Sequence, residues 1–203
     1  LGAAVQNVTG SESTSRAFGG VATLSYTYDQ RYAADFNIRM DASSEFGRNN
    51  RYAPFWSGGV RWNIDKEKFV KKWKLFDELI FRSTYGITGT QGFSPYQALQ
   101  MYTYSNSMRI YQSSDVVGTL LYGMGNPDLK WQTTKAFNLG LDFNMLHRII
   151  SGRFEYYYKL TENTVIDYSM APSVGFTNIK DNIGNISNEG YEFTLRFMPY
   201  NNL

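Results

Sequence analysis

The chain has 203 residues, with 20 Lys and Arg against 18 Asp and Glu, and its net charge of +2 gives no general electrostatic case for binding nucleic acid. It contains no cysteine, which excludes disulfide scaffolds, thiolate metal sites and cysteine nucleophiles. No apolar run in the sequence approaches the roughly eighteen residues that a membrane-spanning helix needs.

Alternation of apolar and polar residues predicts seven β-strands along the chain. The alternation is clearest in residues 135–144, where Phe and Leu side chains alternate with Asn, Gly and Asp. In chain order, the predicted strands are residues 17–29, 33–43, 54–64, 78–87, 131–145, 149–168 and 187–200.

The polar face of these strands is too charged for the core of a soluble protein. In an outer-membrane barrel, outward side chains meet lipid and inward ones meet a hydrated lumen. The aromatic content of 17% also suits the girdles at the two membrane interfaces. The sequence therefore predicts an all-β fold, an antiparallel transmembrane β-barrel segment. We expect Phe137, Leu141, Phe143, Phe154 and Phe193 to face lipid, and Asp142, Arg153, Glu155 and Arg196 to face the lumen.

The predicted strand number is odd, whereas bacterial single-chain barrels have even numbers of strands. The sequence also begins without the signal peptide that a secreted barrel requires. We therefore expect residues 1–203 to be part of one transmembrane barrel domain, with further strands outside this sequence.

Connection lengths predict the orientation of the strands, because periplasmic turns are short and extracellular loops are long. Residues 29–32 and 145–148 are predicted periplasmic turns, and the extracellular loops are residues 44–53, 88–130 and 172–184. Residues 65–77 break this rule, since they form a long periplasmic connection rich in lysine. Its apolar residues have helical spacing and predict a short amphipathic turn. The sequence favours a solvated connection over one that binds anionic lipid headgroups.

Candidate catalytic and metal-binding residues have plainer explanations. The single histidine, His147, lies in a predicted turn without a second His or any Cys to complete a metal site. Acidic pairs such as Asp41 and Glu45 are routine on a barrel lumen, and no nucleophile, base and oxyanion donor converge by spacing. The sequence therefore predicts neither an enzyme nor a bound cofactor or metal.

Three phrases occur along the chain: Asp29-Gln30-Arg31-Tyr32, the run Pro54-Phe55-Trp56-Ser57-Gly58-Gly59, and Asn126-Pro127-Asp128-Leu129-Lys130-Trp131. They resemble consecutive barrel segments of SusC/RagA-type TonB-dependent outer-membrane transporters. Residues 39–47, 82–91 and 182–192 resemble further segments of that family, in the same order. Residues 1–16 and 93–124 carry no phrase of the family.

The resemblance implies a Gram-negative outer-membrane protein that crosses the membrane many times in a barrel of about 22 strands. It also implies an N-terminal plug, energy from TonB through a segment absent from this sequence, a SusD-like surface lipoprotein and import of oligosaccharides or peptides. A passive porin or a surface-adhesion barrel remains the alternative. A soluble β-sandwich is disfavoured, because its inner faces would have to contain residues such as Arg39, Arg153 and Glu155.

The long loop of residues 93–124 is the candidate contact site for substrate or lipoprotein. We expect it to lack regular structure, and loops of this length are usually functional or disordered. Its tyrosines could stack on sugar rings, while its polar groups could bond hydroxyls or peptide amides. Packing into the barrel mouth is the alternative. The candidate contact residues are Tyr96, Tyr102, Tyr104, Arg109, Tyr111 and Tyr122.

Overall fold

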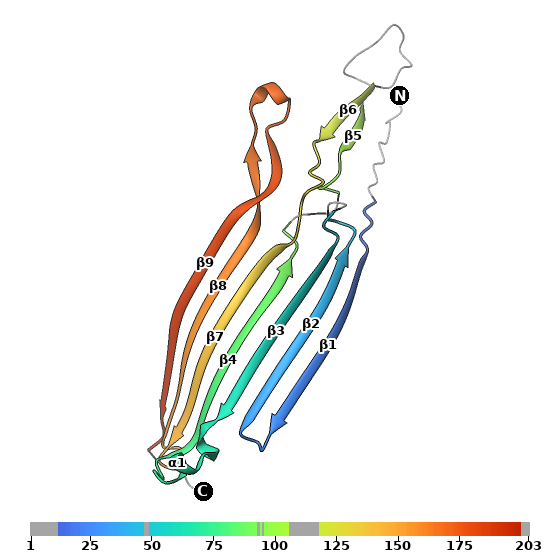
Figure 1. Cartoon of the computed structure of the whole chain (residues 1–203). Coiled ribbons are helices and arrows are strands. Elements are labelled where there is room, and N and C mark those ends of the chain that lie inside the picture. The colour runs from blue at the N-terminus through green and yellow to red at the C-terminus, as the bar shows by residue number, and fades with distance from the viewer. Residues whose placement is uncertain (1–11, 47–48, 93, 95, 106–117, 200–203) are drawn as a thin grey trace, which may run out of the picture.

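A single curved antiparallel sheet dominates the computed structural model, which describes residues 12–199 except 47–48, 93, 95 and 106–117 (Figure 1). Seven strands form it in the order β1-β2-β3-β4-β7-β8-β9. Their bounds are Ala17–Tyr28, Tyr32–Ser43, Tyr52–Asn63, Phe76–Thr90, Gln132–Met145, Ile150–Ser169 and Asn178–Phe197. The seven strands predicted from alternation are thus confirmed, although β9 begins at Asn178, before its predicted start at residue 187.

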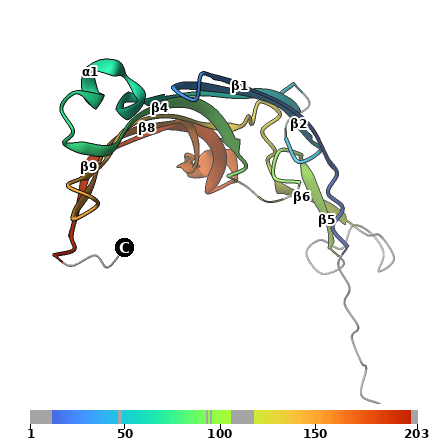
Figure 2. The same ribbon diagram turned by 90° about the horizontal axis from the view of Figure 1, so that it is seen from below.

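Seen along the strands, the sheet forms an open arc (Figure 2). β1 and β9 lie at its two edges and do not pair with each other. Curvature of this kind is what a sheet needs to form part of a barrel wall, because strands of a barrel tilt and bend around a common axis. No helix among the described residues has the length and apolar character needed to cross a membrane.

Cross-strand register gives the sheet two chemically different faces. Leu141 lies opposite Phe154, which in turn lies opposite Phe193, so one apolar row crosses β7, β8 and β9. The neighbouring row contains Asp142 and Arg153 and is polar. Directly opposed residues share a face in a pleated sheet. The predicted placement of Leu141, Phe154 and Phe193 on one face, and of Asp142 and Arg153 on the other, is therefore confirmed.

Short turns lie at one end of the sheet and longer connections at the other. β1 and β2 are joined by residues 29–31, and β7 and β8 by residues 146–149. Asp29 and Gln30 have φ values of 49° and 51°, as expected for a tight hairpin whose turn matches the strand twist. By the usual rule, this end is periplasmic and the opposite end is extracellular.

The long periplasmic connection between β3 and β4 contains a 3-10 turn, η1 (Ile64–Lys66), and one helical turn, α1 (Lys68–Lys71). Glu67 anchors it, because its Oε1 accepts hydrogen bonds from the Tyr32 hydroxyl at 2.6 Å and from Trp62 Nε1 at 3.3 Å. The hydrogen bond from Tyr32 lowers the pKa of Glu67, so the carboxylate remains ionised at neutral pH. The predicted short amphipathic turn is thus present.

Two extracellular predictions are wrong. The loop after β4 contains a separate hairpin of β5 (Met101–Ser105) and β6 (Gly118–Gly123), although no regular structure was expected there. In addition, β9 begins at Asn178, so much of the predicted loop 172–184 is a strand paired with β8. The Asn- and Gly-rich start of β9 has no apolar alternation, which is why the sequence did not reveal it. A strand beyond the membrane needs no lipid-facing row.

An aromatic cluster lies on the polar face near its extracellular end. The ring of Trp131 lies 4.0 Å from that of Phe46 and 5.6 Å from that of Phe55, measured between centroids. Phe46 and Phe55 are both buried, and Leu129 beside Trp131 in sequence has no exposed surface. A Cβ atom at Gly89 would overlap the Phe55 ring, so glycine gives this ring its place against the neighbouring strand.

Asparagine side chains fix residues 126–131 to β9. The Asn182 side chain forms the two hydrogen bonds that the backbone of a neighbouring strand would form. Its Oδ1 accepts a hydrogen bond from Lys130 N at 3.0 Å, and its Nδ2 donates one to Lys130 O at 3.0 Å. Its Nδ2 also donates to Asn163 O at 2.7 Å. Asn126 Nδ2 donates to Lys180 O at 3.1 Å, so the same segment is held at both ends. These bonds position the chain that leads from the β5–β6 hairpin back into β7.

We predict that Leu141→Arg will lower the free energy of unfolding of the full-length barrel by about 2–4 kcal/mol, because an arginine near mid-membrane meets lipid. Ser25→Arg is the matched control, since Ser25 lies opposite Asp35 on the polar face. Its cost should be much smaller. Folding titrations in lipid vesicles measure both values, and equal costs would contradict the separation of the two faces.

We predict that Asn182→Ala will lower the free energy of local opening at residues 126–131 by about 1–3 kcal/mol, since several hydrogen bonds to backbone groups are lost. Amide hydrogen exchange followed by mass spectrometry should show faster exchange there, with the centres of β7 and β8 unchanged. Asn185→Ala replaces an exposed asparagine of the same strand and should leave this exchange unaltered. Equal effects of the two variants would contradict the role assigned to the Asn182 side chain in holding residues 126–131.

Candidate functional site

The centre of the polar face contains an ion-pair network from three adjacent strands. Arg82 on β4 donates to Asp142 on β7 at 2.9 Å and to Glu155 on β8 at 3.0 Å. Arg153 on β8 donates to the other oxygen of Asp142 at 2.6 Å. Two cations and two anions therefore balance one another across the face. Gly140 lies beneath Arg82, where a Cβ atom would come within 3.1 Å of the guanidinium.

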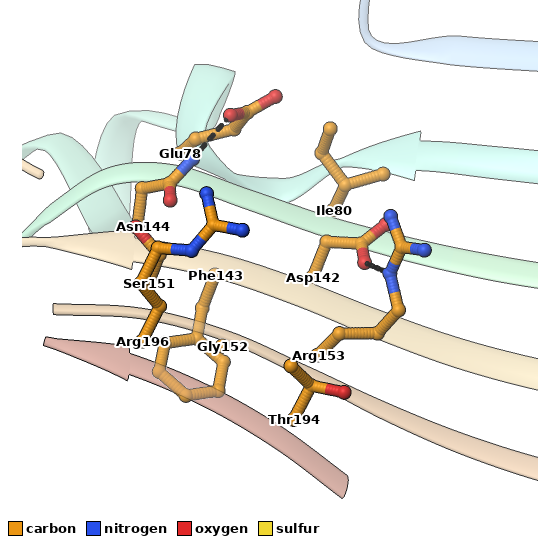
Figure 3. A pocket seen from close by; sticks show the side chains of 10 residues that line it. All are labelled: Glu78, Ile80, Asp142, Phe143, Asn144, Ser151, Gly152, Arg153, Thr194 and Arg196. Carbon is orange, nitrogen blue, oxygen red and sulfur yellow. Dashed lines mark hydrogen bonds and ion pairs between the residues drawn. The ribbon is translucent and has the colours of Figure 1, made fainter. Parts of the chain in front are cut away.

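A shallow hollow lies on the same face, on the periplasmic side of this network (Figure 3). Glu78 accepts a hydrogen bond from Asn144 Nδ2 at 2.6 Å on one side of the hollow, and the pair of Asp142 and Arg153 lies on the other. Arg196 on β9 also lines the hollow and forms no ion pair with any described residue. These groups can hydrogen-bond water, polar side chains or a passing polar solute.

A second hollow lies at the extracellular end of the structure. It lies between the β5–β6 hairpin and residues 164–184, the outer part of the β8–β9 hairpin, which we call the β8–β9 arm. Tyr122 and Gln97 line one side, and Phe176 lines the other. Lys180 and Asp167, which pair across the arm at 3.0 Å, also line it. The hollow thus offers an exposed aromatic ring beside amide and charged groups, which is a suitable surface for a polar ligand with flat apolar faces.

The structure brings only part of the predicted contact set together. Tyr122 lines the extracellular hollow and is 70% exposed, and Tyr102 on β5 is 60% exposed. Tyr96 differs, because its hydroxyl accepts from Thr14 N at 2.7 Å and donates to Thr14 O at 3.2 Å. Tyr104 lies on β5 with its backbone opposite Thr119. Arg109 and Tyr111 fall outside the described residues.

Sequence reasoning missed the contribution of the β8–β9 arm to this hollow. Asp167 and Lys180 are opposed in the register, but two irregularities between Thr161 and Val165 precede that pairing. Asn163, in the same stretch, has a φ of 58°. No periodic signal in the sequence predicts such a register. An acidic and a basic residue on either side of a turn that contains Pro172 and Gly175 were the only available indication.

Comparison with known proteins agrees with this architecture. The family model described as TonB dependent receptor-like, beta-barrel matches residues 2–203. TonB-dependent receptor P3 of Formosa agariphila is 34% identical over 172 residues, covering 85% of this chain and 17% of that protein. TonB-dependent receptor SusC of Bacteroides thetaiotaomicron is 31% identical over 179 residues, covering 87% of this chain and 18% of that protein.

Among solved structures, the RagAB peptide transporter matches with a TM-score of 0.82 and 29% identity, over 93% of this chain and 20% of that chain. The chain thus spans between 17% and 20% of the length of these relatives. The family match is consistent with the antiparallel sheet and with its apolar and polar faces. The chain therefore belongs to the TonB-dependent receptor-like β-barrel family of Gram-negative outer-membrane proteins, and within that family it is of the SusC/RagA type.

Proposed function

We propose that this chain forms part of the barrel wall of a TonB-dependent active importer. One observation supports this above all others: an apolar face continuous over seven strands lies opposite an ion-paired polar face, in a chain that matches the family from residue 2 to residue 203. A wall of this kind separates lipid from a hydrated passage. The family match favours an importer over the passive porin or adhesion barrel considered above.

We infer that residues 1–203 belong to one barrel domain of about 22 strands. The open edges of β1 and β9 present backbone groups that lipid cannot satisfy, so neighbouring strands are needed to pair with them. A plug domain and a TonB-contacting segment would lie elsewhere in the same protein. Transport, rather than catalysis of a reaction, is the role that this family membership supports.

The proposed cargo is an oligosaccharide or a peptide. Relatives of this chain include SusC and the RagAB peptide transporter, and the name of the second specifies a peptide cargo. On the polar face, the network of Arg82, Asp142, Arg153 and Glu155 offers fixed hydrogen-bonding groups that carry no net charge. Such a surface suits the passage of neutral, hydroxyl- or amide-rich solutes, because it hydrates them without holding them strongly.

We propose that the extracellular hairpin contacts the substrate or a SusD-like surface lipoprotein. Tyr102 and Tyr122 carry this proposal, since both rings are largely exposed and Tyr122 lines a hollow that also contains amide and charged groups. Tyr104, Arg109 and Tyr111 belong to the same proposed surface by their place in the sequence. Tyr96 is a weaker member, because its hydroxyl is already bonded to the backbone of Thr14.

We predict that replacing residues 101–123 by a short Gly/Ser link will leave barrel assembly intact but weaken uptake. The hairpin forms its own two-stranded sheet, so its removal spares the pairing of the seven-stranded one. Residues 96–100 and 124–131 are retained because Ala98 and Leu129 are buried. Growth on candidate glycans or peptides, with surface abundance measured in parallel, separates uptake from assembly.

A smaller change tests the aromatic contacts themselves. Tyr102→Ser combined with Tyr122→Ser should lower capture by about tenfold, equivalent to roughly 1.4 kcal/mol of binding free energy. Tyr168→Ser is the matched control, because Tyr168 is an exposed tyrosine of the β8–β9 arm that does not line the hollow. Normal uptake by the double variant at normal abundance would restrict the hairpin to a packing role.

A further inference from the structure

From Glu67 onward, the lysine segment, residues 66–74, lies against the outside of the barrel wall, whereas Lys66 lines a hollow with the polar-face residues Arg61 and Glu78. The anchor of the segment, Glu67, is bonded to the side chains of Tyr32 and Trp62, which oppose each other in the register and stack with ring centroids 6.2 Å apart. Both rings belong to the apolar face, in the row next to Ala34 and Val60 on their strands. Figure 2 accordingly shows α1 on the convex side of the arc.

A β-bulge at the start of β4 gives the segment a second anchor on the same side. Phe76 lies opposite Met145 and Glu78 lies opposite Asn144, so one extra residue shifts the alternation and places Phe76 on the apolar face. The Trp73 ring lies 6.5 Å from the Phe76 ring and 6.3 Å from that of Phe69. The aromatic surface of the wall therefore continues into the lysine segment.

The segment exposes aromatic rings and cations together. Trp73 is 62% exposed and Phe69 is 51% exposed, whereas Val70 is buried. All the lysines of the segment are exposed, and of these only Lys66 has an ion-pair partner among the described residues, Asp65 at 3.8 Å. The lysines without such a partner are Lys68, Lys71, Lys72 and Lys74.

We propose that the lysine segment binds the phosphate groups of anionic phospholipids in the periplasmic leaflet of the membrane. Its position on the lipid side of the wall brings the lysines to the level of the headgroups, where Trp is also preferred. Lysines near such a surface are attracted to anionic lipid, and neighbouring aromatic rings enter the interface. The two anchors to apolar-face residues favour this binding over the solvated connection that the sequence alone favours.

The test uses the full-length protein in vesicles that contain photoactivatable phosphatidylglycerol or photoactivatable phosphatidylcholine as a minor component. Cross-linked peptides are mapped by mass spectrometry. Residues 66–74 should be labelled about fivefold more by the anionic probe at low salt, and the preference should fall as salt is added. Labelling of the apolar strand faces should show no such preference, because those side chains contact acyl chains.

Replacing Lys68, Lys71, Lys72 and Lys74 by Gln should abolish the preference for the anionic probe. The matched control replaces Lys130, Lys135, Lys159 and Lys180 by Gln, which removes the same charge elsewhere and should preserve the preference. Heat-modifiable mobility on gels checks that both variants fold. Equal labelling by the two probes in the unmodified protein, or an undiminished preference in the first variant, would overturn the proposal.

Discussion

Strand register is the constraint on which the rest of this structure depends. Side chains alternate with a period of two, so a slip of one residue would move every lipid-facing group of a strand to the polar face. Across β1 to β4 and β7 to β9, the register keeps most of the large apolar and aromatic side chains on one face and most of the charged ones on the other. Phe55, opposite Arg39, and Tyr157, opposite Asn138, are aromatic exceptions on the polar face. The bulge before Glu78 obeys the same demand, because it returns Phe76 to the apolar face.

The same register produces the chemistry of the polar face. Arg82, Asp142 and Glu155 are far apart in the sequence, and they meet because β4, β7 and β8 are neighbours in a fixed alignment. Partly exposed ion pairs contribute little individually, but a network in a hydrated lumen holds its charges in defined positions. The wall can therefore be apolar towards lipid and polar towards the interior of the barrel. At this network the polar face has no net charge.

Much of the wall was predictable from the sequence because alternation is a local signal. Residues 135–144 predict both the strand and its faces without reference to any other segment. The extracellular structure was not predictable in this way. Asn182 bonds to Lys130, and Phe46 stacks on Trp131, through contacts between residues remote in sequence that leave no periodic pattern. The β5–β6 hairpin was missed because its two strands are short and lie outside the sheet.

The most direct test of the two-faced wall is a spin-label scan of β7 in the full-length protein within lipid vesicles. This chain contains no cysteine, so labels introduced singly at residues 137, 138, 139, 141, 142, 143 and 144 are unique within it. Collision with dissolved oxygen, which concentrates in lipid, should be high at Phe137, Leu139, Leu141 and Phe143 and low at Asn138, Asp142 and Asn144. Oxygen accessibility without this alternation, or with maxima at the polar positions, would contradict the account.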